Sequence, residues 1–225
     1  MLEMPDGNIV LPCPPQNARK VAKGRRNHFT GQTNVGAQEE SGMDIESYTE
    51  LQVLLALLAR PGTVHVENQV EFAFTGPDGG TDRHFFDFRA TKADGSRTAI
   101  MVKAAYRFRQ ASIHDQLTYI ASQVTKSFAD SVEVLTEKNL VPSEIHNAEM
   151  MHQMRRPVPD VDAAARRAIR DIRGHVLIRD LVEIIGHAGD GFQAVVRLIR
   201  SHELKLTRRE RISYETYVTR SNQDA

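Results

Sequence analysis

The first regular pattern of apolar positions along the chain predicts a helix that begins near Ser47. Ser47 is followed three residues later by Glu50, which is the spacing of an N-terminal capping box. The apolar residues behind it recur at intervals of one helical turn: Leu51, Leu54, Leu55 and Leu58. Pro61-Gly62 then ends the pattern, so the helix is expected to stop there.

Beyond this helix the pattern changes to short runs that are typical of β-strands. The runs cover residues 63–66, 70–74, 84–90 and 98–104, and turns rich in glycine and aspartate separate them. Helical spacing returns over residues 112–128, a further strand is expected over 131–135, and a further helix over 142–154. This order predicts a mixed α/β domain over residues 45–156.

A second domain is expected over residues 157–225, after the break made by Pro157-Val-Pro159. Helical patterns cover residues 161–172, 176–185 and 191–204, and glycines end the first two. Alternation with a period of two then runs through Ile212, Tyr214 and Thr216. Three short helices followed by a hairpin are typical of a winged helix-turn-helix.

The first 44 residues have little periodic apolar content and predict a flexible arm. A basic cluster lies in this arm: Arg19, Lys20, Lys23, Arg25 and Arg26. Two interpretations remain open. The arm either serves as a solubilising tail or follows the phosphates of a nucleic acid.

Composition narrows the class of protein. The 225 residues are 40% hydrophobic, which is enough for a packed core, and no run is long and apolar enough for a membrane span or a secretory signal. The single cysteine, Cys13, excludes an internal disulfide and a cysteine-cluster zinc site, so a cytoplasmic protein is expected. The 29 basic and 29 acidic residues cancel, but a net charge of zero says nothing about where the charges lie.

Asp87 and Lys103 are the residues of the α/β domain most suggestive of chemistry. Asp87 lies in the expected strand 84–90 and Lys103 near the end of the expected strand 98–104. Neighbouring strands can bring an acid and an amine to one edge of a sheet, and Glu50 on the preceding helix can approach the same point. Two carboxylates and a lysine suit phosphodiester hydrolysis assisted by Mg²⁺ or Mn²⁺.

The stretches SYTELQVLLALLARPGTVHVENQ, HFFDFRATKADG and AIMVK together resemble TnsA-type transposon endonucleases of the PD-(D/E)XK, restriction-endonuclease-like superfamily. VEVLTEKNL and EIHNAEMM continue the similarity, which covers residues 43–218. The resemblance implies a restriction-endonuclease-like sheet flanked by helices, followed by a winged-helix domain. It also implies that Glu50 and Asp87 hold the metal and that Lys103 is the catalytic lysine. Its implied partners are DNA and transposition proteins, namely a transposase and an ATPase regulator.

Met101 departs from the family pattern, which places an acid, or a glutamine in TnsA-type enzymes, two residues before the lysine. A thioether is a poor ligand for Mg²⁺, yet strand alternation would put residue 101 on the same face as Lys103. Three alternatives follow. The protein uses one metal held by Glu50, Asp87 and a backbone carbonyl near Val102, recruits a displaced acid such as Glu71, or keeps the fold as a DNA-binding scaffold without cleavage.

The second domain carries an excess of basic residues. Between residues 155 and 211, thirteen basic residues face eight acidic ones. The expected DNA contacts lie on or after the third helix and at the start of the wing: Arg197, Arg200, Lys205, Arg208, Arg209 and Arg211. The alternatives are a solvated face with acidic partners one turn away and a domain that docks proteins.

Overall fold

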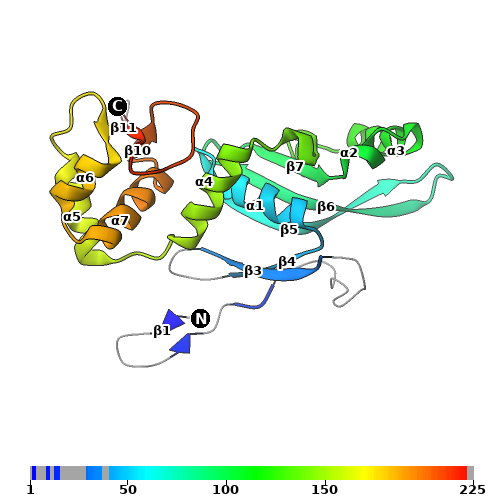
Figure 1. Ribbon diagram of the computed structural model, residues 1–225. Helices are drawn as coiled ribbons and strands as arrows, with labels where there is room; N and C mark the ends of the chain where they lie inside the picture. The colour runs from blue at the N-terminus through cyan, green and yellow to red at the C-terminus, as the bar shows by residue number, and fades with distance from the viewer. Residues whose placement is uncertain (1, 4–8, 11–12, 16–28, 37–40, 222–225) are drawn as a thin grey trace. The chain divides into compact units, whose positions relative to one another are not determined.

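The computed structural model describes residues 2–3, 9–10, 13–15, 29–36 and 41–221 (Figure 1). The chain divides into two compact units between Leu140 and Val141, and the second unit also takes in Gly36. No helix of the described residues is long and apolar enough to cross a membrane.

The first unit is a mixed α/β structure built on one four-stranded sheet with the order β5-β6-β7-β8. Its strands are β5 (Thr63–Thr75), β6 (Thr81–Lys92), β7 (Arg97–Val102) and β8 (Ser131–Leu135). The first three pair antiparallel and β8 pairs parallel to β7. The helical elements are α1 (Tyr48–Ala59), α2 (Ala105–Phe108), α3 (Ala111–Ser122) and η1 (Glu137–Asn139).

The predicted start of α1 is confirmed. Ser47 is its N-cap, and the Ser47 hydroxyl accepts a hydrogen bond from the Glu50 amide at 3.1 Å. Leu54 on this helix is fully buried in a core cluster that also holds Val66, Phe88 and Ile100 of the sheet. A second cluster joins Phe86 and Met101 of the sheet to Leu117 and Ile120 of α3. Helices therefore cover both faces of the sheet.

The predicted flexible arm is wrong for its last part. Strands β3 (Gly31–Val35) and β4 (Ser41–Ile45) form an antiparallel hairpin, with Met43 and Ile45 buried in the same cluster as Leu54. Their burial supplies the apolar contacts that the short local pattern did not predict. The basic cluster at residues 19–26 lies outside the described residues. Near the N-terminus, β1 (Leu2–Glu3) pairs with β2 (Ile9–Val10).

The second unit contains four helices and a small three-stranded sheet among its described residues. Its elements are α4 (Pro142–Gln153), α5 (Pro159–Ile169), β9 (Val176–Leu177), α6 (Ile178–Ile185), α7 (Ala188–Arg200), β10 (Leu204–Leu206) and β11 (Tyr217–Arg220). The strands pair antiparallel in the order β10-β11-β9. The start predicted for the second helix is wrong, because Val176 and Leu177 pair with β11 before α6 begins.

Helix α4 belongs to the second unit, so the domain boundary expected at residue 157 falls inside that unit. The physical reason is Asn147, which is 8% exposed. Its amide donates to the Glu210 carbonyl and its oxygen accepts from the Ile212 amide, each at 2.8 Å. These bonds tie α4 to the segment after β10, a contact between distant parts of the chain that local pattern cannot predict.

Helix α7 is the central helix of the second unit. Its residues 194–199 are all buried, and its exposed residues lie in the first turn. The close turn from α6 requires glycine at position 191, because a Cβ there would lie 2.5 Å from the Gly186 carbonyl oxygen. The expected hairpin is present with shifted bounds: residues 207–216 form the long connection between β10 and β11.

Candidate functional site

The candidate site lies where β6 and β7 separate. Regular pairing between these strands ends at Phe88 and Ile100. The residue of β6 just before Phe88 is Asp87, and its Oδ2 accepts a hydrogen bond from the Val102 amide at 2.7 Å. The amide of Lys103 donates instead to the Leu135 carbonyl on β8, at 2.9 Å. The end of β7 thus follows β8, and the carboxylate of Asp87 takes the position of a missing backbone partner.

Asp87 and Lys103, which the sequence predicted to meet, are brought together at this point. The Lys103 ammonium lies 3.9 Å from Asp87 Oδ2. The side chain of Asp87 is 10% exposed and that of Lys103 is 31% exposed, so the acid is enclosed while the lysine reaches solvent. An ion pair at this depth is partly shielded from water and keeps more of its strength than a surface pair.

The backbone of the neighbouring strand β5 is irregular opposite Asp87. The register places Gln69 there, between the pairs Asn68↔Phe88 and Val70↔Phe86. Gln69 has a φ of 51° and is 1% exposed. A buried non-glycine residue in the left-handed region costs on the order of 1 kcal/mol or more, and such strain concentrates at functional sites.

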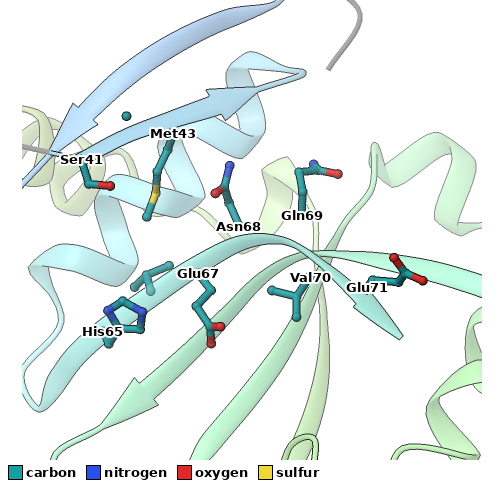
Figure 2. A pocket seen from close by; sticks show the side chains of 10 residues that line it. Ser41, Met43, His65, Glu67, Asn68, Gln69, Val70 and Glu71 are labelled. Atoms are coloured by element: carbon teal, nitrogen blue, oxygen red, sulfur yellow. The ribbon is translucent and has the colours of Figure 1, made fainter. Parts of the chain in front are cut away.

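Figure 2 shows the consequence for the side chains of β5. Asn68 and Gln69 project to the same side of the strand, whereas Glu67 and Val70 project to the other. A pocket of about 280 Å³ lies beside them, lined by residues of β4 and β5. Glu67-Asn68-Gln69 ends the first of the stretches that resemble the family, but no sequence signal indicated a left-handed glutamine.

Strand β6 is irregular at the same level. Phe86 and Phe88 are two residues apart, so a regular strand would direct them to one face. Phe86 instead packs in the cluster beneath α3, and Phe88 in the cluster beneath α1. The alternation of side chains between the two faces of β6 is therefore interrupted at Asp87. Strands β5 and β6 are both irregular next to the Asp87 carboxylate.

Glu50 lies near Asp87 and carries a perturbed carboxyl group. Its oxygens accept hydrogen bonds from the Glu46 amide at 3.0 Å and the Ser47 hydroxyl at 2.9 Å. Burial, with the negative charge of Asp87 as the second cause, raises the pKa of Glu50 from 4.5 to about 7, although these two hydrogen bonds oppose the rise. Glu50 can therefore exchange a proton near neutral pH.

We expect this carboxyl group to make folding stability depend on pH. Between about pH 4.5 and pH 7 the folded protein binds a proton at Glu50 that the unfolded chain has lost, so stability falls as pH rises through this window. The fall is on the order of 2–3 kcal/mol by linkage. Glu50→Gln should remove it, which urea unfolding at pH 5 and pH 8 would measure.

Glu133→Gln is the matched control, because Glu133 is an exposed carboxylate on β8 of the same unit. This variant should show the same change in unfolding free energy between the two pH values as the unmodified protein. An unchanged pH dependence in Glu50→Gln would mean that Glu50 is ionised like an ordinary surface acid.

The alternatives for metal binding depended on Met101 and Glu71. Met101 lies in an apolar cluster, and Glu71 lies in an exposed ion pair. Met101 is fully buried in the apolar cluster with Phe86 and Leu117, where it fills the core beneath α3. Glu71 is exposed, and its carboxylate contacts Arg83 at 3.3 Å. Among the described residues, no group of three or more Asp, Glu, His or Cys side chains is placed to hold a metal ion.

Two carboxylates are nevertheless a donor set that suits Mg²⁺. This ion is commonly held by one or two protein carboxylates, with water and substrate phosphate supplying the other oxygens. Glu50 and Asp87 offer such a pair, close enough for the charge of Asp87 to raise the pKa of Glu50. The contribution of a carbonyl near Val102 stays a prediction.

The residues expected to bind DNA fall into two groups. Arg197 is buried and ion-paired with Asp162 at 2.7 Å, and Arg200 is half-buried. Arg197 therefore does not lie on an exposed helix face that could enter a groove, whereas the DNA contact expected of Arg200 stays a prediction. Lys205, Arg208 and Arg211 are exposed and make no ion pair within the described part of the chain.

Arg209 is exposed as well, but its Nε donates to Glu144 at 2.6 Å. The segment that carries these residues is anchored by a contact that sequence reasoning did not find. The ring of Tyr214 stacks on Phe192 of α7 with centroids 4.7 Å apart. Comparison of the sequence with protein-family models and with curated proteins gives no match.

Proposed function

We propose that this protein is a Mg²⁺-dependent DNA endonuclease of the TnsA-like, PD-(D/E)XK type. The contact of Lys103 with Asp87 at the separation of β6 and β7 carries the proposal. The order of elements supports it. The helix that begins at Ser47, the strand with Gln69, the strand with Asp87 and the strand before Lys103 follow one another as the resemblance implies.

In this mechanism Glu50 and Asp87 would hold the metal ion, which neutralises charge on the phosphodiester when bound. Lys103 donates hydrogen bonds from its ammonium group and orients the attacking water or stabilises the negative charge that develops on the phosphoryl oxygens. Water attacks phosphorus and one ester oxygen leaves, giving a phosphate monoester and a hydroxyl group. Glu50 gives up its proton near pH 7, so the carboxylate required for a metal is available above that pH.

The second unit would hold the DNA as a winged helix, through three of the contacts expected from sequence. Lys205 and the connection 207–216, which carries Arg208 and Arg211, present exposed positive charge from the wing. Helix α7 would contribute through its exposed first turn. A transposase and an ATPase regulator stay predicted partners, because the resemblance alone suggests them.

A second candidate function is a DNA-binding protein that keeps this fold without cleavage. The placement of Met101 favours it, since no acid occupies that position and the side chain is part of the core. Installing a glutamate there would bury a charge among Phe86, Leu117 and Ile120, so that substitution is expected to destabilise the fold rather than complete a site.

Nicking of plasmid distinguishes the endonuclease from the DNA-binding protein that does not cleave. Supercoiled plasmid incubated with the protein and Mg²⁺ or Mn²⁺ should be nicked, and a chelator should stop the reaction because the carboxylates alone cannot neutralise the phosphodiester. Intact plasmid with either metal, together with salt-sensitive DNA binding, would favour the non-cleaving protein. Absence of DNA binding at low salt contradicts both.

The wing contacts are tested separately by the triple variant Lys205→Gln, Arg208→Gln, Arg211→Gln. Each charge that neutralises a phosphate contributes about one unit to the slope of log affinity against log salt concentration. We expect the slope to fall by about two to three units and affinity at 100 mM salt to weaken without a change in thermal stability. The control variant Arg173→Gln alters an exposed arginine of the same unit and should leave the slope unchanged.

A further inference from the structure

The short helix α2, which follows β7 in Figure 1, has one apolar face and one exposed face. Ala105 is 5% exposed, and Phe108, one helical turn later, packs against the cluster beneath α3. The face turned to solvent carries Tyr106 and Arg107, and Arg109 follows as the exposed C-cap. This face therefore joins one aromatic ring to two guanidinium groups.

The ring of Tyr106 is available to a planar ligand. Tyr106 is 65% exposed, whereas the ring of the neighbouring Phe108 contacts His114. The Tyr106 hydroxyl accepts a hydrogen bond from Arg107 Nε at 3.2 Å, which links the two side chains. An exposed aromatic ring beside a guanidinium is the combination on which nucleic acid bases stack.

The exposed face of α2 has more positive than negative charge around it. Neither Arg107 nor Arg109 forms an ion pair with a residue that the structure describes. An acid that reaches the segment is Glu137 of η1, and its two oxygens accept hydrogen bonds from the Ala105 amide at 2.9 and 3.2 Å. This bonding is the main cause that lowers the pKa of Glu137, and the charges of Lys138 and Arg109 lower it further. Three cations beside one engaged carboxylate leave an excess of positive charge that attracts a polyanion.

This surface is close to the candidate site. Lys103 precedes Tyr106 by three residues, so their Cα atoms are at most about 11 Å apart. A DNA strand advances about 3.4 Å per nucleotide, so this distance corresponds to about three nucleotides. A strand with one phosphate at Lys103 and Asp87 would therefore pass α2 within a few nucleotides. Positive charge next to a site that suits a phosphodiester favours nucleic acid over a protein partner.

We propose that Tyr106, Arg107 and Arg109 bind the strand beside the scissile phosphate, and that Tyr106 stacks on an unpaired base there. Bases inside a duplex stack on one another, so a ring on the protein surface meets a free base only where the duplex ends or is opened. The two arginines hold the adjacent phosphates through charge-assisted hydrogen bonds. The substrate is then DNA with an unpaired nucleotide near the cleavage point. The proposal rests on the proposed function, because both require DNA to bind at Lys103 and Asp87.

Fluorescence anisotropy with the full chain, in EDTA so that no cleavage occurs, measures the preference. The probes are a continuous duplex and the same duplex with a short unpaired stretch at its centre. The unmodified protein should bind the opened duplex about tenfold or more tightly, because one base stacks on the ring. Tyr106→Ala should lose this preference and Tyr106→Phe should keep it, because stacking needs the ring and not the hydroxyl. The matched control Tyr119→Ala removes a 41% exposed tyrosine from α3 of the same unit and should also keep the preference.

A fluorescent purine analogue in the unpaired stretch reports stacking directly. Its emission should be quenched by the unmodified protein and by Tyr106→Phe, and should stay unquenched with Tyr106→Ala. The double variant Arg107→Gln, Arg109→Gln should lower the slope of log affinity against log salt concentration by about one to two units on both duplexes. Tyr106→Ala should keep the melting temperature of the unmodified protein, because most of the side chain is already in solvent.

Equal affinity of the unmodified protein for both duplexes, or a preference that persists in Tyr106→Ala, would overturn the stacking site and leave this surface to a different partner. If the protein nicks plasmid but binds both duplexes equally, the stacking site is refuted and the proposed cleavage stands. If the preference depends on Tyr106 and nicking is absent, the stacking site stands and cleavage is refuted. Absence of binding to either duplex contradicts both.

Discussion

Replacing Asp87 with asparagine should lower metal-dependent nicking of plasmid at least about a hundredfold while leaving the protein folded. Asparagine keeps a side-chain oxygen, so it can still accept the hydrogen bond from the Val102 amide. It loses the negative charge that draws the Lys103 ammonium to 3.9 Å and that would hold the metal ion. The rate of nicking in Mg²⁺ and in Mn²⁺ is the measurement.

The same variant should show a second change that a purely structural role would not produce. The charge of Asp87 is one of the causes that raise the pKa of Glu50, so its removal should move the midpoint of the Glu50 titration below 7. Carbonyl-edited infrared spectra or carboxyl carbon NMR shifts would follow that titration.

The matched control for Asp87→Asn is Asp115→Asn. Asp115 lies on α3 of the same unit, and its side chain is 83% exposed. This control should nick at the unmodified rate. If Asp87→Asn nicks as fast as the control, the carboxylate takes no part in the chemistry. If the unmodified protein does not nick, the DNA affinities of the two proteins are compared instead, and Asp87→Asn should retain the affinity of the unmodified protein.

Replacing Arg197 with methionine should lower the free energy of unfolding of the second unit by about 3–5 kcal/mol. The ion pair between Arg197 and Asp162 is enclosed, with both side chains 9% exposed. Methionine fills similar volume but leaves the Asp162 charge buried without its cation. Asp162 keeps the hydrogen bond from the Val158 amide at 2.9 Å, which places the expected loss near the lower end of the range. Urea unfolding, with hydrogen exchange to resolve the second unit, measures it.

The exposed ion pair between Arg166 and Glu203 is the natural comparison. The side chains of Arg166 and Glu203 are 55% and 30% exposed, so Arg166→Met should cost no more than about 1 kcal/mol. A double variant that removes both Arg197 and Asp162 should recover part of the loss, because no unpaired charge then remains in the core. A cost at Arg197 no larger than that at Arg166 would mean that the buried pair contributes little, and the surface assignment of Arg197 would regain support.

Local pattern predicted most elements of both units, because their signals lie within a few residues. The capped start of α1 depends on Ser47 and Glu50, three positions apart, and β8 was predicted at residues 131–135 with the bounds observed. Local pattern did not predict β4, which was expected to belong to a flexible arm. Its apolar content is two residues, Met43 and Ile45, and their burial comes from contacts with α1 and the sheet.

At the candidate site, the sequence by itself determined which side chains meet, and the tertiary structure decided their state. Strand order was enough to predict that Asp87 and Lys103 lie together, because β6 and β7 follow one another and the turn between them is visible in the sequence. The left-handed backbone of Gln69 and the raised pKa of Glu50 were not predictable. The first belongs to the irregular pairing of β5 opposite Asp87, and the second comes from burial of Glu50 and from the charge of Asp87, and no local segment encodes either.

The second unit shows the same difference between what the sequence determined and what the tertiary structure decided. Sequence determined that its arginines are numerous and that α7 is a helix, since both are properties of composition and spacing. It could not assign those arginines to surface or interior. Arg197 is buried because Asp162, on a different helix, supplies the charge that makes burial tolerable. Arg200, three residues later on the same helix, forms no ion pair among the described residues and is only half-buried, a difference that depends on which residues of other elements pack against each position of α7.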